Sequence, residues 1–119
     1  KGWFVEPTLL VDVDPDSTIA QQEVFGPVLA VIPFDDDDDA VHIANNSIYG
    51  LSGAVNSGDI ERAKAVGRRI RSGTMSINGG VYYGADVPFG GYRQSGLGRE
   101  MGIEGFEEYL ETKSFAEPA

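Results

Sequence analysis

Residues 27–78 alternate between apolar runs of strand length and segments of helix length, and this alternation constrains the fold more than any other feature. Three stretches have the composition of strands: PVLAVIPF at 27–34, LSGAVNSG at 51–58 and TMSIN at 74–78. The segments 35–50 and 59–73 lie between them and carry apolar residues at helical spacing. Strand–helix–strand connections of this length favour parallel pairing, so the sequence predicts an α/β fold with a parallel sheet.

The run at 27–34 is almost continuously apolar, which is typical of a strand covered on both faces. We therefore expect it near the centre of the sheet. A further strand is expected at 3–13, followed by a turn at 14–17. The helix expected at 59–73 can be capped by Asp59. With 119 residues and 41% hydrophobic content, the chain is large enough for one domain with its own core.

Charge and cysteine content exclude several classes of function. Nineteen acidic and nine basic residues give a net charge of −10, which opposes binding to nucleic acid and to anionic membranes. We see no apolar run of about 18 residues and no secretory leader, so we expect no membrane partner and a cytoplasmic location. The absence of cysteine excludes disulfides and a thiol nucleophile within this sequence. The chain starts at Lys1, directly before a strand-like segment, as expected for a piece of a longer protein.

Several short motifs suggest chemistry but fit structural roles better. The run Asp35–Asp39 lacks the alternating ligands and central glycine of a calcium loop, and suits an acidic helix start. His42 is the only histidine and fits a helix surface. GLGREMG at 96–102 lacks the spacing of a dinucleotide-binding turn, and RQSGLG around Ser95 lacks a glycine of the nucleophile elbow. RRIR at 68–71 suits the C-terminal end of a helix.

Glu23 stands shortly before a turn at Gly26 and Pro27 that leads into the apolar run. The turn restricts the backbone and so fixes the direction of the side chains just before it. A carboxylate held in this place is either paired within the protein or presented to a ligand. The residues alone leave both alternatives open.

Five segments together resemble a known family. They are GWFVEPTLL, EVFGPVLAVIPF, ANNSIYGLSGAV, SGTMSIN and PFGGYRQSGLGRE, in this order. In order and separation they resemble the C-terminal quarter of the NAD(P)-dependent aldehyde dehydrogenases, and the resemblance covers essentially the whole sequence. It implies that residues 1–108 belong to the catalytic domain and that residues 109–119 form an oligomerisation tail. Within this tail, residues 109–117 are expected to form a strand that pairs with a neighbouring subunit.

The resemblance also implies roles for individual residues. Glu23 matches the glutamate that binds the ribose next to the nicotinamide of NAD or NADP. Phe25 matches the aromatic residue that packs beside this ribose and the nicotinamide. Phe89 matches the aromatic residue that borders the aldehyde pocket, and the loop with Val81 and Tyr83 matches a segment that lines the substrate.

The activity implied by the resemblance is the oxidation of an aldehyde to a carboxylic acid through a cysteine thioester. In the family, the cysteine, the general-base glutamate, the oxyanion asparagine and the nucleotide-binding domain precede this region. The chain is therefore expected to be inactive alone. Its expected partners are the aldehyde, the rest of the enzyme and further subunits. The alternative is a free-standing, non-catalytic module that uses the same fold for binding or assembly.

Overall fold

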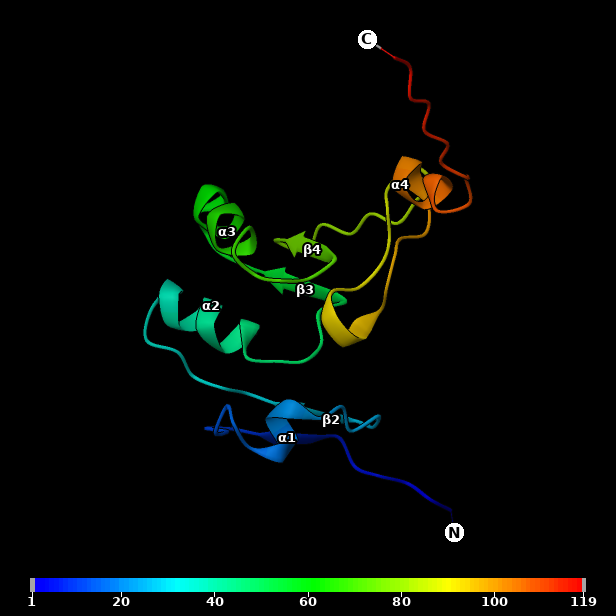
Figure 1. Cartoon of the computed structure of the whole chain (residues 1–119). Coiled ribbons are helices and arrows are strands. Elements are labelled where there is room, and N and C mark those ends of the chain that lie inside the picture. Colours follow the sequence, from blue (N-terminus) through cyan, green and yellow to red (C-terminus); the bar gives the residue numbers. More distant parts are fainter. Residues whose placement is uncertain (1, 119) are drawn as a thin grey trace.

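The computed structural model describes residues 2–118, so the outer limits of the expected division, Lys1 and Ala119, lie outside it. The helices and strands are β1 (Thr8–Leu10), α1 (Thr18–Gln21), β2 (Val28–Ala30), α2 (Asp37–Asn45), β3 (Ser52–Val55), α3 (Ile60–Gly67), β4 (Thr74–Ile77), the 3₁₀ helix η1 (Arg93–Ser95) and α4 (Gly102–Glu107). Strands and helices alternate as far as β4 (Figure 1), which confirms the α/β class.

The strands form two separate pairs, both parallel. β1 pairs with β2, with Leu9 opposite Leu29, and β3 pairs with β4, with Ala54 opposite Ser76. The expectation that 27–34 lies at the centre of one sheet is wrong within residues 2–118, because β2 pairs only with β1 there. Leu29 is 61% exposed, so this part of the chain does not cover both faces of the strand.

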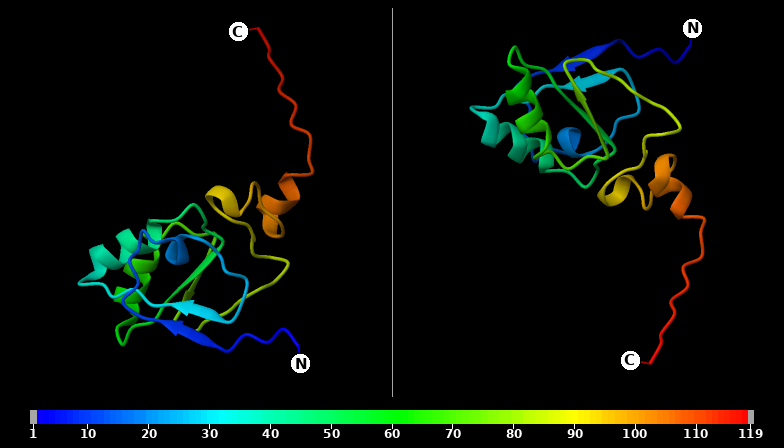
Figure 2. Two further views of the ribbon diagram at one scale, coloured as in Figure 1. Left: turned by 90° about the horizontal axis from the view of Figure 1, so that it is seen from below. Right: turned by 90° about the horizontal axis from the view of Figure 1, so that it is seen from above.

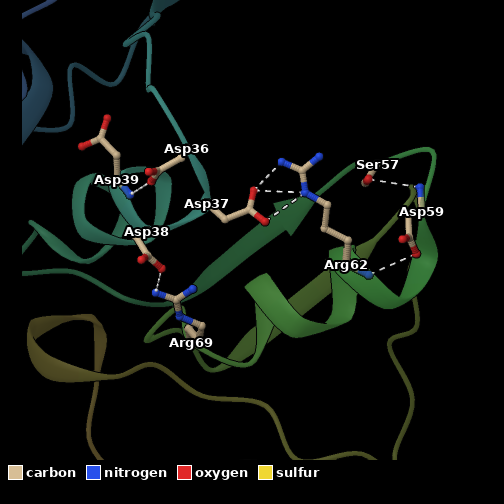
Figure 3. A network of polar contacts seen from close by, with 8 residues as sticks. All are labelled: Asp36, Asp37, Asp38, Asp39, Ser57, Asp59, Arg62 and Arg69. Atoms are coloured by element: carbon tan, nitrogen blue, oxygen red, sulfur yellow. Dashed lines mark hydrogen bonds and ion pairs between the residues drawn. The ribbon is translucent and has the colours of Figure 1, made fainter.

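Acidic residues cap both longer helices, as expected from the sequence. The Asp36 side chain accepts a hydrogen bond from the Asp39 amide at the start of α2, and Asp59 accepts from the first-turn amides of α3. Figure 3 shows how the aspartate run also joins the two helices. Arg62 on α3 binds Asp37 with its shortest contact at 2.6 Å, and Arg69 binds Asp38 at 2.6 Å. The hydrogen bond from Arg62 holds the pKa of Asp37 below its ordinary value of 3.8.

Helix α3 packs on the β3–β4 pair and forms most of the small core. The buried apolar side chains among residues 2–118 are Val41, Ala63 and Val66. Gly67 lets the helix approach the sheet, because a Cβ atom there would lie 3.1 Å from atoms of both Met75 and Ile77. His42 is exposed on α2, and no group of three potential metal-binding side chains is found in the part of the chain that the structure describes.

The expectation of one domain with its own full core is wrong for this chain. Its radius of gyration is 19.0 Å, whereas a compact chain of this length has about 13.5 Å. Its accessible surface is 9689 Å², compared with about 6,300 Å² for a compact protein of 12.8 kDa. Figure 1 shows an open arrangement, in which the β1–β2 pair lies apart from the α2–α3–β3–β4 unit, and Figures 1 and 2 show that the C-terminal segment projects from it.

The segment 109–118 follows α4 and runs away from the other elements in all three views (Figures 1 and 2). Residues 109 and 110 still form a turn on α4, since the N–H groups of Tyr109 and Leu110 donate to the carbonyls of Phe106 and Glu107. The segment is exposed, and no strand is formed between 109 and 118. The strand expected at 109–117 needs a partner edge, and its pairing with a second subunit stays a prediction. No helix in residues 2–118 is long and apolar enough to cross a membrane.

Candidate functional site

Glu23 lies just after α1 and borders a cavity of about 500 Å³. Other polar side chains around this cavity include those of Ser47, Tyr49, Arg71 and Ser95. Glu23 is exposed, and within residues 2–118 its carboxylate forms no ion pair and accepts no hydrogen bond. Internal pairing, which the sequence left open, is therefore not observed in the described part of the chain.

Phe25 has an unusual backbone conformation, with φ at 58°. A bulky residue rarely adopts positive φ, and such strain concentrates at functional sites. The Phe25 side chain is 92% exposed and therefore buries almost none of its apolar surface against this chain. Phe25 and Glu23 both border a second, smaller cavity of about 310 Å³ beside β2. The structure thus brings the two residues of the expected cofactor site together.

The position of Glu23 depends on how α1 is anchored. The side-chain amide of Gln21 donates to the carbonyl oxygen of Asn46, which follows α2, at 2.7 Å. The same amide donates to the carbonyl oxygen of Pro15 at 2.6 Å. Since Glu23 follows Gln21 by two positions, the segment that carries Glu23 is attached to the end of α2.

Phe89, expected at the aldehyde pocket, is half-buried and fixed through its backbone. Its N–H donates to the carbonyl of Glu100 at 2.7 Å, and its carbonyl accepts from the Glu100 N–H at 2.8 Å. The Tyr83 ring lies edge-on to the Phe89 ring, with centroids 5.5 Å apart. Val81 lies on the same loop and is 86% exposed. The structure therefore brings Tyr83 and Phe89 together, while Val81 buries little surface within this chain.

The loop before Phe89 has one internal polar contact. The hydroxyl of Tyr82 donates to the Asp86 carboxylate at 2.7 Å. This hydrogen bond raises the pKa of Tyr82 above its ordinary value of 10.0, because the negative carboxylate stabilises the protonated phenol. Tyr82 and Asp86 are four residues apart, so this hydrogen bond restrains the conformation of the loop that contains Val81 and Tyr83.

The expected cofactor and substrate regions meet at Leu51 and Ser95. Both residues border the Glu23 cavity, and both also border a cavity of about 360 Å³ that contains Phe89. The Gly50 N–H donates to the Ser95 hydroxyl at 2.9 Å, and the Gly50 carbonyl accepts from the Tyr92 N–H at 2.9 Å. The segment before β3 thus contacts the segment after Phe89.

The sequence reasoning missed the junction of Gly50 and Ser95. The sequence around Ser95 suggests only a comparison with a nucleophile, whereas in the structure the Ser95 hydroxyl accepts a hydrogen bond from the Gly50 N–H. The two residues stand in the segments ANNSIYG and RQSGLG, which belong to the family resemblance, but nothing local in these segments indicates that they contact each other. The one-turn helix α1 was also missed, because its four residues TIAQ include none that is buried.

Comparisons with known proteins identify the family to which the chain belongs. The sequence model of the Aldehyde dehydrogenase family matches residues 1–115. The chain is 49% identical over 114 residues to a 3-succinoylsemialdehyde-pyridine dehydrogenase of Pseudomonas sp., covering 96% of this chain and 24% of that protein. It therefore spans about a quarter of the length of this curated relative.

Solved structures extend the comparison to the fold. A betaine aldehyde dehydrogenase from Staphylococcus aureus, in complex with NAD⁺, matches with a TM-score of 0.87 at 50% identity, over 94% of this chain and 22% of that one. An aldehyde dehydrogenase from Mycobacterium tuberculosis, complexed with NAD⁺, matches with a TM-score of 0.87 at 48% identity, over 98% and 24%. At this identity, the likeness extends beyond a shared fold.

Proposed function

We propose, since this chain belongs to the aldehyde dehydrogenase family, that it acts as part of an enzyme that oxidises an aldehyde to a carboxylic acid. The chain would supply the residues that bind the nicotinamide ribose and part of the aldehyde pocket. The nucleophile would come from elsewhere in the complete enzyme, because the chain has no cysteine. NAD is the first cofactor to test, since solved relatives are complexed with NAD⁺, and NADP is the alternative.

The observation that carries the proposal is the exposed carboxylate of Glu23 beside the strained Phe25 backbone. A carboxylate has two oxygens that accept hydrogen bonds, and a ribose presents two adjacent hydroxyls as donors. Glu23 would thus hold the diol, while the exposed Phe25 ring would pack beside the sugar and the nicotinamide. Both contacts restrict the position of the ring that reacts, which favours hydride transfer by orientation.

The complete reaction divides between this chain and the rest of the enzyme. A cysteine thiolate adds to the aldehyde carbon, and that carbon then loses a hydride to leave a thioester. When bound, the nicotinamide cofactor supplies the hydride acceptor. Water hydrolyses the thioester, which releases the carboxylic acid and restores the thiol. Phe89 and Tyr83 would border the aldehyde, with Val81 on the same loop, and would contribute apolar contacts that select the substrate.

The exposed apolar surface of the chain supports the proposal that it is part of a larger enzyme, and counts against the alternative of a free-standing module. Leu9 and Leu29 are partners in the β1–β2 register and are 60% and 61% exposed. The accessible surface exceeds that of a compact protein of this size by about 3,400 Å². The remainder of the enzyme would cover much of this surface, and the tail would pair with a further subunit.

The proposal is tested by comparing the isolated chain with a complete enzyme that contains it. Each is incubated with NAD⁺ or NADP⁺ and a panel of aldehydes, and formation of the reduced cofactor is followed by absorbance. The complete enzyme should turn over, whereas the isolated chain should not, because it lacks the thiolate. A steady rate from the isolated chain that survives repurification would contradict the proposal.

Urea unfolding of the isolated chain tests the alternative. A free-standing module should unfold in one cooperative transition and bind little of a dye that reports exposed apolar surface. A segment that depends on the rest of an enzyme should instead unfold gradually and bind the dye strongly. Cooperative unfolding with weak dye binding would favour the module and count against the proposed role.

A further inference from the structure

Among the described residues shortly before Glu23, Gln21 has a side chain that forms hydrogen bonds to two other parts of the chain. Its Nε2 atom is 2.7 Å from the carbonyl oxygen of Asn46 and 2.6 Å from that of Pro15. A side-chain amide has two N–H donors, so these two bonds use both of them. The side chain is only partly buried, and its bonds therefore serve to hold segments together more than to satisfy a buried group.

A second contact joins the same two segments. The side-chain amide of Asn46 donates to the Asp16 carboxylate at 2.7 Å, just before α1. Asn46 thus accepts a hydrogen bond from Gln21 at its backbone carbonyl and donates one to Asp16 from its side-chain amide. These bonds attach both ends of α1 to the residue that follows α2.

These polar contacts matter because α1 has little else to fix it. The helix is a single turn and contains no buried residue. Helices this short are not stable by themselves. Glu23 lies two positions beyond Gln21, so two residues of chain limit how far it can move from that anchor, to about 7 Å. Within residues 2–118 the Glu23 carboxylate forms no contact that could fix it independently.

We propose that Gln21 is a positioning residue for Glu23. By bonding to the Asn46 carbonyl, Gln21 holds the end of α1 and so sets where the Glu23 carboxylate meets the ribose. This inference rests on the proposed role of Glu23. It adds a residue that touches neither cofactor nor aldehyde and acts only through the position of its neighbour.

Replacing Gln21 by methionine in the complete enzyme tests the inference. Gln21→Met keeps the length of the side chain but removes both donors. We expect the KM for NAD⁺ to rise and kcat to fall, each by roughly 3- to 10-fold, with the KM for the aldehyde nearly unchanged. Gln94→Met is the matched control, because Gln94 is exposed on η1 and its side chain forms no hydrogen bond within residues 2–118.

A double-mutant cycle with Glu23→Gln distinguishes a positioning effect of Gln21 on Glu23 from a general loss of structure. If Gln21 acts through Glu23, Gln21→Met should cause little further loss in the Glu23→Gln enzyme. If the losses caused by Gln21→Met and Glu23→Gln multiply in the double variant, the inference is overturned. A Gln21→Met enzyme with the kinetics of the parent would overturn it as well. If Glu23→Gln itself has no effect, the proposed role of Glu23 fails first, so the two failures are distinguishable.

Gln21→Lys provides a second variant that decides the question if Gln21→Met does not fold. A lysine ammonium can donate to both carbonyl oxygens and so retains the anchor. We expect its KM for NAD⁺ to stay within about twofold of the parent. A loss as large as that caused by Glu23→Gln, in an enzyme with the parent's melting temperature, would contradict the inference.

Discussion

The rings of Tyr83 and Phe89 meet edge to face, with centroids 5.5 Å apart and planes at 77°. Phe89 is fixed through its backbone bridge to Glu100, whereas Tyr83 is 66% exposed on the loop before it. The pair therefore joins an anchored aromatic residue to a more exposed one. If Phe89 borders the aldehyde pocket as proposed, its position there would be fixed, whereas the more exposed Tyr83 would be freer to move.

Replacing Phe89 by alanine in the complete enzyme should change the relative kcat/KM values among aldehydes. Apolar contacts with a substrate differ by about 1–3 kcal/mol between close analogues, so bulky and small aldehydes should be affected unequally. Steady-state kinetics with a series of aliphatic and aromatic aldehydes measures this change. Equal slowing of every aldehyde would show that Phe89 is only structural support.

Gly73 should not tolerate a side chain. A Cβ atom added there would lie 1.6 Å from the carbonyl oxygen of Gly90, which is backbone and cannot rotate away. Gly73→Ala must therefore displace the start of β4 or the segment after Phe89, at a cost of at least about 1–3 kcal/mol. We expect a lower melting temperature and reduced activity. Gly58→Ala is the matched control, because nothing lies within 4 Å of a Cβ atom there.

The tail from residue 109 should contribute to assembly of the complete enzyme. Tyr109 and Phe115 are 84% and 86% exposed, so their side chains bury little surface against this chain. A strand in such a position can pair with a sheet edge in a second subunit. Light scattering should therefore show a smaller oligomer after removal of residues 109–119. A truncated enzyme with the full oligomeric mass would show that the tail is not an assembly element.

A point substitution separates strand pairing from loss of the whole tail. Proline cannot donate to a strand partner, so Thr112→Pro should weaken assembly if the Thr112 N–H takes part in the pairing. Thr112→Val should leave the oligomer intact, since it keeps the backbone N–H and favours strand structure.

Local patterns predicted the type and order of the elements from 35 to 78, but the helices are shorter than expected: α2 spans Asp37–Asn45 within 35–50, and α3 ends at Gly67 instead of residue 73. The helix α3 begins directly after Asp59, whose side chain caps it, and β4 matches the alternating segment TMSIN. The pairing of β2 was not predictable in the same way, because an apolar run does not specify which strand edge it meets. The helix α1 was missed because a bond to Asn46, 25 positions from Gln21, helps to hold it rather than a local pattern.

The candidate site, like the fold, was predictable from the sequence only in part. Glu23, Phe25 and Phe89 came from the resemblance, and their roles stay predictions. The positive φ of Phe25 was not expected, since a bulky residue rarely adopts it. The junction of the two cavities at Leu51 and Ser95 depends on segments far apart in sequence. A sequence identifies such residues individually but does not bring them together.

Single-turnover kinetics of Glu23→Gln in the complete enzyme test the central claim most directly. The amide keeps the size of the side chain but loses the negative charge and one of the two acceptor oxygens, so it cannot accept from the two ribose hydroxyls through separate oxygens. Hydride transfer, followed by formation of the reduced cofactor after rapid mixing with aldehyde, should slow by roughly 10- to 100-fold, with the melting temperature nearly unchanged. Hydride transfer at the parent's rate under cofactor saturation would contradict the assignment of Glu23 to the cofactor site.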